Sequence, residues 1–164
     1  LLQNSGAFMK PRHRELCGAI LELKDNKHKR VKLGVIELVP RLSEHCSDSF
    51  VRSHLDDSID FLMKSTKVPE LKAASLLSIG RLCRKMGAHL SYRIDDLVDV
   101  LSAVLLTTKM KMRGVPSEAL KCISDMVCGL GVSFHYRVLG LLDAMLQAGL
   151  TEDLIEALSV ITSN

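Results

Sequence analysis

Two clusters of aspartate are the residues whose type and spacing come closest to a catalytic pair. The first cluster is Asp56, Asp57 and Asp60, and the second, with the same spacing, is Asp95, Asp96 and Asp99. Paired carboxylates can perform general acid–base catalysis. Acidic residues also gather in the first turns of helices, where the helix dipole stabilises them. We interpret both clusters in this second way, as surface charge on helices.

Two basic runs are the only concentrations of positive charge in the sequence. They are Lys24–Lys32, KDNKHKRVK, and Lys109–Arg113, KMKMR. Such runs can contact phosphate or an acidic partner, but no aromatic residues interleave with them to stack on bases. We therefore favour an acidic protein partner over nucleic acid. The candidate contact residues on the two expected loops are Lys27, Lys29, Arg30, Lys109, Lys111 and Arg113.

The histidines and cysteines do not form a metal-ligand pattern. No two histidines are spaced i, i+4 with a carboxylate between them, and no Cys-x-x-Cys motif occurs. The odd number of cysteines, five, predicts reduced thiols in an intracellular protein. No phosphate-cradling Gly-rich loop, Gly-x-Ser-x-Gly elbow or kinase motif is present. The sequence therefore predicts no catalytic residue, metal or cofactor in this stretch.

Composition indicates a folded helical protein. The 164 residues are 47% hydrophobic but only 4% aromatic, so small and aliphatic side chains must form the core, which suits close packing between helices. The net charge of +3 is too small to indicate a nucleic-acid-binding surface. No apolar run reaches the roughly 20 residues of a membrane span, and the N-terminus lacks the order of a signal peptide.

The clearest helix signal runs from Val68 to Gly87. Pro69 suits the first helical position, and Glu70 suits the first turn. Apolar residues recur at helical spacing behind them, and small residues between these let a neighbouring helix approach closely. We expect Gly87 to end this helix in the left-handed conformation.

Similar amphipathic patterns predict helices along the rest of the chain, with no strand alternation and no hairpin signal. The expected helices cover residues 11–23, 27–45 with a kink or an early stop at Pro40, 47–64, 91–105, 116–130, 134–148, and 151 onward. Residues 107–115, TTKMKMRGV, lack periodicity and are expected to form a longer loop.

Every second expected helix begins near Lys27, Pro69, Pro116 or Thr151, at intervals of about 42, 47 and 35 residues. These intervals bracket the repeat length of ~40 to 47 residues that is typical of HEAT and armadillo proteins. We predict an all-α fold: a right-handed α-solenoid, or α-α superhelix, of HEAT-type helical pairs from a longer array. The expected units are 1–24 as the second helix of a preceding repeat, repeats at 27–65, 69–107 and 116–148, and 151–164 as the first helix of a further repeat. A compact four-helix bundle is the alternative.

Four blocks in the sequence carry a family resemblance. They are LLQNSGAFMKPRHREL, VKLGVIELVPRLSEH, ASLLSIGRL and LLDAMLQAGLTEDLIEAL. In order and spacing they resemble the N-terminal HEAT-repeat region of the target-of-rapamycin (TOR) protein kinases, across essentially the whole chain. Residues 107–115 depart from the family pattern.

This resemblance implies a much longer parent protein, a serine/threonine kinase of the phosphatidylinositol-3-kinase-related family. In that family a FAT region, a rapamycin-binding segment and a kinase domain that uses ATP and Mg²⁺ follow the solenoid. The N-terminal solenoid would be a non-catalytic scaffold that receives Raptor-type or Rictor-type subunits and helps to form a dimer. The setting would be nutrient-responsive growth signalling in the cytoplasm, with endomembrane surfaces and the nucleus as further locations. No catalytic residue of the family falls within these residues.

Two other functions remain open at this point. An adaptor or transport factor of the importin or adaptin kind would have the same solenoid, would bind short linear peptides and would carry no kinase. A self-contained helical enzyme would need converging polar groups, for which the sequence gives no signal.

Overall fold

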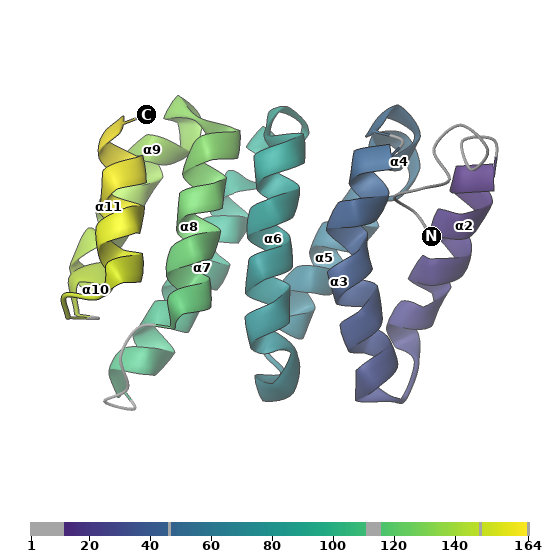
Figure 1. The fold of residues 1–164 in the computed structure, drawn as a ribbon, viewed down its shortest axis with the longest axis horizontal. Helices are drawn as coiled ribbons and strands as arrows, with labels where there is room; N and C mark the ends of the chain where they lie inside the picture. Colours follow the sequence, from purple (N-terminus) through teal and green to yellow (C-terminus); the bar gives the residue numbers. More distant parts are fainter. Residues whose placement is uncertain (1–11, 46, 111–115, 148, 164) are drawn as a thin grey trace. The chain divides into compact units, whose positions relative to one another are not determined.

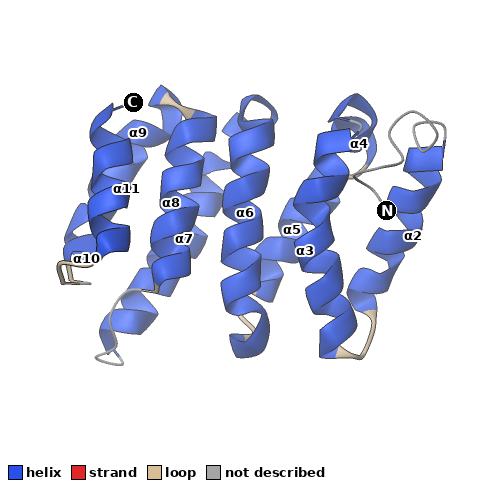
Figure 2. Cartoon of the chain, viewed as in Figure 1, coloured by secondary structure: helices blue, strands red, loops and turns tan. Residues whose placement is uncertain are grey.

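The structure, a computed structural model, consists of helices joined by short turns (Figure 1). It describes residues 12–45, 47–110, 116–147 and 149–163. No strand occurs among these residues (Figure 2), so the predicted all-α class is confirmed. The chain divides into two compact units, Leu1–Ser78 and Ile79–Asn164, and the boundary lies inside helix α6 (Pro69–Leu90). Within the described ranges, no helix is long and apolar enough to cross a bilayer.

The described residues of the first unit form four helices and the first half of α6. The four are α2 (His13–Glu22), α3 (Lys29–His45), α4 (Ser47–Ser53) and α5 (Leu55–Ser65), and the 3-10 turn η2 (Leu23–Asp25) joins α2 to α3. Helices α2 and α3 pack side by side, and α4 contacts both. The buried side chains are mainly aliphatic and recur at helical spacing, as in Val35, Val39 and Leu42 of α3.

A buried histidine links α2 to α3. The Nε2 of His13 lies 3.0 Å from the carbonyl oxygen of Leu42, and the Sγ of Cys17 lies 3.3 Å from the Nδ1 of His13. A carbonyl oxygen can only accept, so Nε2 carries the proton, and in the neutral ring Nδ1 accepts from the Cys17 thiol. This polar pair therefore joins two helices inside the core.

The second unit is built as two layers of helices (Figure 1). The second half of α6, α8 (Ser117–Leu130) and α11 (Glu152–Ser163) form one layer. The other layer contains α7 (Ile94–Met110), α9 (Val132–Val138) and α10 (Leu142–Leu146), with the 3-10 turns η3 (Ser91–Arg93) before α7 and η4 (Leu139–Leu141) between α9 and α10. Helical pairs that stack in two layers are the packing that an α-solenoid requires.

Glycines allow α6 and α8 to pack with their backbones almost in contact. A Cβ added at Gly80 would lie 2.9 Å from the Cα of Cys122. A Cβ at Gly87 would overlap the backbone of Gly129, and one at Gly129 would overlap the carbonyl group of Cys83. The predicted left-handed end at Gly87 is therefore wrong. Helix α6 is kinked at Met86, whose φ and ψ are −117° and 16°, and helical residues resume after it and reach Leu90. Gly87 has no positive φ, and it is needed because only a hydrogen atom fits between the two helices.

Further expected boundaries also need correction. The predicted helix 47–64 is broken at His54, whose φ and ψ are −136° and −14°. Phe50 and Leu55 are both buried, and a continuous helix would place side chains five residues apart about 140° from each other, so the break lets both reach the core. The predicted helix 134–148 begins earlier, at Val132, and is interrupted by η4.

Two other segments are more helical than the sequence indicated. Helix α7 runs to Met110, so residues 107–110 are helical rather than part of a loop, and Thr107 donates a 2.6 Å hydrogen bond to the carbonyl oxygen of Ala103. The rest of the expected loop, residues 111–115, lies outside the described residues. Helix α3 does not stop at Pro40 but continues to His45. Gly131 and Gly149 have positive φ, as helix-ending glycines should.

Candidate protein-interaction surface

The first predicted contact segment, Lys27–Arg30, forms an exposed turn that leads into α3. Lys27 and His28 precede the helix, and Lys29 and Arg30 are its first residues. The side-chain oxygen of Asn26 accepts a 2.9 Å hydrogen bond from the backbone N–H of His28. Such a local hydrogen bond fixes the course of a turn. The basic side chains are therefore presented from a defined backbone.

Lys29 forms an ion pair that joins the first turns of two helices. Its Nζ contacts the Oε1 of Glu70 in α6, and both side chains are exposed. The hydrogen bond from Lys29 lowers the pKa of Glu70, with smaller contributions from the backbone N–H of Glu70 and from the charge of Lys29. Both helices therefore begin at the same end of the first unit, and a carboxylate is stabilised there.

Two more lysines lie at this end, where α5 ends and the chain turns into α6. Lys64 is in the last turn of α5, and Lys67 lies three residues before Glu70; both are exposed. Sequence reasoning missed them because they are distant from Lys27–Arg30 in the chain. The available signal was the Lys-x-x-Lys spacing just before Pro69, at the start of the helix whose Glu70 pairs with Lys29.

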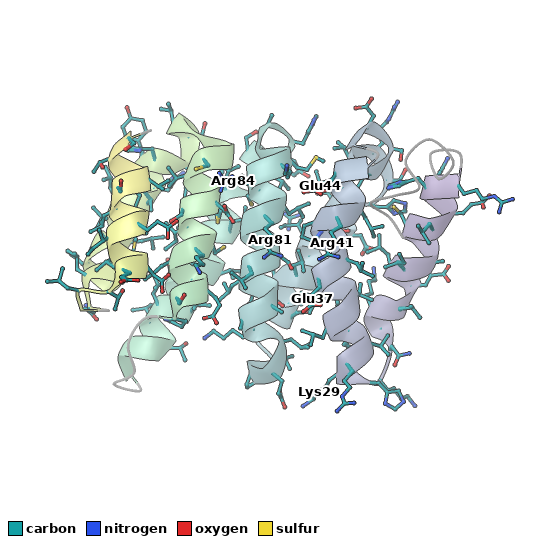
Figure 3. The ribbon with its side chains drawn as sticks, viewed as in Figure 1. Lys29, Glu37, Arg41, Glu44, Arg81 and Arg84 are labelled. Atoms are coloured by element: carbon teal, nitrogen blue, oxygen red, sulfur yellow. The ribbon has the colours of Figure 1, made fainter. Side chains whose placement is uncertain are left out.

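The outward face of α3 beyond its first turns carries both signs of charge. Figure 3 shows Glu37, Arg41 and Glu44 along this helix, away from Lys29 at its N-terminal end. Arg41 lies four residues after Glu37 and three before Glu44, so opposite charges are neighbours on the helix surface. The positive charge of α3 is therefore concentrated at its N-terminal end.

The second predicted contact segment is only partly described. Lys109 lies in the last turn of α7 and not in a loop, which corrects the prediction for this residue. Lys111 and Arg113 lie outside the described residues. Lys109 belongs to the second unit, whereas Lys27, Lys29 and Arg30 belong to the first.

The aspartate cluster of α7 participates in ion pairs with neighbouring groups. Asp95 accepts from Arg137 of α9 at 2.9 Å, and Asp96 accepts from Arg93 at 2.7 Å. Asp95 and Asp96 lie in the first turn of the helix, as expected for dipole-stabilised charge. In the other cluster, Asp57 contacts Lys24. These contacts favour the structural interpretation of both clusters.

The cysteines of the second unit differ sharply in exposure. Cys83 and Cys122 are fully buried at the α6–α8 contact, and Cys128 is exposed. Burial raises the pKa of Cys83 to about 12 and raises the pKa of Cys122 well above its ordinary value. The two buried thiols therefore stay protonated and behave as small apolar side chains. Among the described residues, no group of His, Cys, Asp or Glu side chains could hold a metal ion.

Comparison with known proteins connects this helical chain to one kinase family. No protein-family model matches the chain. The serine/threonine-protein kinase TOR of rice is 29% identical over 100% of the chain, and TOR of Arabidopsis thaliana is 26% identical over 99% of it. The kinase tor1 of Schizosaccharomyces pombe is 20% identical over 100% of the chain. The chain is homologous to a segment of the TOR kinases.

This homology concerns a small part of each kinase. The chain spans about 7% of the length of the rice and fission-yeast TOR proteins and about 6% of the Arabidopsis protein. The similarity nevertheless extends from end to end of the chain. The resemblance seen in the four ordered sequence blocks is therefore confirmed.

Proposed function

We propose that the chain is a non-catalytic HEAT-repeat scaffold segment of a TOR-type kinase. The observation that supports this most directly is the end-to-end similarity to TOR kinases, at 29% identity to the rice protein. The packing of helices in two layers in the second unit is the type expected of a repeat scaffold. A rigid frame of this kind presents its turns and outer helix faces to partner proteins.

In this proposal the kinase chemistry belongs to other parts of the longer protein. ATP and Mg²⁺ would bind in its kinase domain, and this segment would contact Raptor-type or Rictor-type subunits and contribute to dimerisation. The setting is nutrient-responsive growth signalling in the cytoplasm. The contacts of Asp95 and Asp96 with arginines, and the protonated state of the buried thiols, support a structural role for these groups.

The test compares the complete TOR-type protein with a variant that lacks the segment corresponding to residues 12–163. We expect the deletion to reduce the amount of co-purified Raptor-type or Rictor-type subunits, or to shift the dimer to monomer in sedimentation. An unchanged subunit composition and an unchanged dimer would overturn the scaffold role. The isolated chain should transfer no phosphate from ATP in the presence of Mg²⁺, and transfer would contradict its non-catalytic assignment.

A further inference from the structure

One end of the first unit carries more excess positive charge than the whole protein. We define the basic end as Lys24, Lys27, Lys29, Arg30, Lys32, Lys64 and Lys67. The two segments that supply these residues, 24–32 and 64–70, contain two acidic residues, Asp25 and Glu70, and Asp57 of α5 pairs with Lys24, so seven basic residues face three acidic ones. The full chain has 22 basic and 19 acidic residues. The remainder of the chain is therefore net negative, and the positive potential is concentrated at this end.

The backbone adds to this positive potential. The N-terminus of a helix has a partial positive charge, which acidic residues in the first turn usually offset. Helix α3 has no acidic residue in its first turn and begins with Lys29 and Arg30. Glu70 partly compensates Lys29, but Lys27 and Arg30 form no ion pair with any described residue. A carboxylate brought to this position would therefore be stabilised by both the side chains and the helix.

The backbone of the turn at the basic end is also fixed before any partner binds. The turn at Asn26 is fixed by its hydrogen bond to His28, and Lys29 is tied to Glu70. Leu23, next to Lys24, is 45% exposed and offers an apolar contact beside the charges. Preorganised groups lose little conformational freedom on binding, so more of their interaction free energy contributes to affinity.

We propose that the basic end docks an acidic segment of a partner protein. The proposal rests on the scaffold function proposed above and names the chemistry of one partner. Carboxylates of the segment would pair with Lys27 and Arg30, in the way that Glu70 already pairs with Lys29. The carboxylates in or paired with the basic end, Asp25, Asp57 and Glu70, favour a protein over an anionic membrane, because a protein can match a mixed charge pattern residue by residue. Segments 24–32 and 64–70 contain no Phe, Tyr or Trp for base stacking, which disfavours nucleic acid.

The binding test uses the chain and a fluorescein-labelled peptide rich in glutamate, with fluorescence anisotropy as the readout. We expect binding that weakens as salt is added. Lys27→Glu combined with Arg30→Glu should weaken it by about tenfold or more, because both attractions become repulsions. The matched control is Arg52→Glu combined with Arg81→Glu, which changes net charge equally at exposed sites elsewhere. The control should change affinity by less than about twofold.

Several outcomes would overturn the proposal. The first is that the peptide does not bind at low salt, and the second is that the control pair weakens binding as much as the reversals do. The third is that the chain binds phosphatidylserine vesicles or polyuridylate more tightly than it binds the peptide, and that the Lys27 and Arg30 reversals abolish this binding. Far-UV circular dichroism checks that both double variants remain folded. If the reversal variant unfolds, Lys27→Gln combined with Arg30→Gln replaces it, with an expected loss of several-fold.

The complete TOR-type protein separates this inference from the scaffold proposal. If deletion of residues 12–163 removes a partner subunit but the Lys27 and Arg30 reversals retain it, the docking inference is wrong and the scaffold role stands. If the deletion changes neither the subunits nor the dimer, the scaffold role is wrong even if the chain binds the acidic peptide.

Discussion

Gly87 provides the sharpest test of how α6 and α8 pack. A Cβ at this position would overlap the carbonyl group of Gly129 and would lie 3.0 Å from the backbone nitrogen of Leu130. Backbone atoms cannot rotate away as a flexible side chain can, so Gly87→Ala must push the helices apart. Overpacking of this kind costs about 1 to 3 kcal/mol, and occasionally more.

The substitution also has a favourable effect, which sets the net magnitude. Alanine is favoured over glycine by about 1 kcal/mol in a helix interior, and this is an upper limit at Gly87, which directly follows the kink at Met86. With an overlap that falls on backbone, we take the upper part of the overpacking range, and the net loss for Gly87→Ala becomes about 2 kcal/mol. For a domain of this size that corresponds to a Tm lower by about 4 to 8 °C.

Gly34 in α3 and Gly18 in α2 are matched controls. Both lie inside helices, and a Cβ at either position would meet no heavy atom within 4 Å. Gly34→Ala and Gly18→Ala should therefore raise stability by up to about 1 kcal/mol, or Tm by about 2 to 4 °C. Urea unfolding followed by circular dichroism gives the free energies, and thermal scans give Tm. The reasoning fails if Gly87→Ala is as stable as the control variants.

Three further predictions concern single groups. Burial lowers the pKa of His54 from its ordinary 6.5, the charge of Arg14 lowers it further, and the charge of Asp57 opposes this shift. Below pH 6.5 the unfolded chain therefore binds more protons than the folded chain, so the free energy of unfolding falls as the pH drops through 6.5. His54→Gln should remove this effect and flatten that part of a plot of the urea midpoint against pH. Iodoacetamide should label Cys128 in the native chain and leave Cys122 protected until unfolding, as peptide mass mapping would show; early labelling of Cys122 would contradict its burial. The Oγ1 of Thr151 accepts a 3.2 Å hydrogen bond from the backbone N–H of Leu154, so Thr151→Ala should cost about 1 kcal/mol in the same unfolding assay, whereas Thr151→Ser should cost much less.

Apolar periodicity was sufficient to predict the helices and most of their starts. Helix α8 begins at Ser117, next to the predicted Pro116-Ser117, and α11 begins directly after Thr151, because capping and proline signals act within a few residues of sequence. The break at His54 could not be predicted in this way. It depends on the directions in which Phe50 and Leu55 reach buried space, and those directions are set by helices elsewhere in the chain.

The role of Gly87 shows the same limit. Glycine near the end of an amphipathic pattern usually signals a helix end, and the sequence contains nothing that distinguishes this use from close packing. The distinguishing residue is Gly129, which is distant in sequence and meets Gly87 only after α6 and α8 have packed. The sequence did not identify Lys64 and Lys67 for a related reason. They lie near Lys29 because α3 and α6 begin at the same end of the first unit.

Ion pairs between helices explain why the basic end differs from the other charged surfaces. Arg84 of α6 pairs with Asp125 of α8 at 2.8 Å, and Lys121 of α8 approaches Asp153 of α11 at 3.8 Å. Each pair joins neighbouring helices within one layer of the second unit and leaves no net charge. Exposed pairs of this kind add little stability, so their main physical effect is to favour one alignment of the helices over others. At the basic end, Lys27 and Arg30 have no such described counterpart, so the free energy of bringing a carboxylate there is still available to a binding partner.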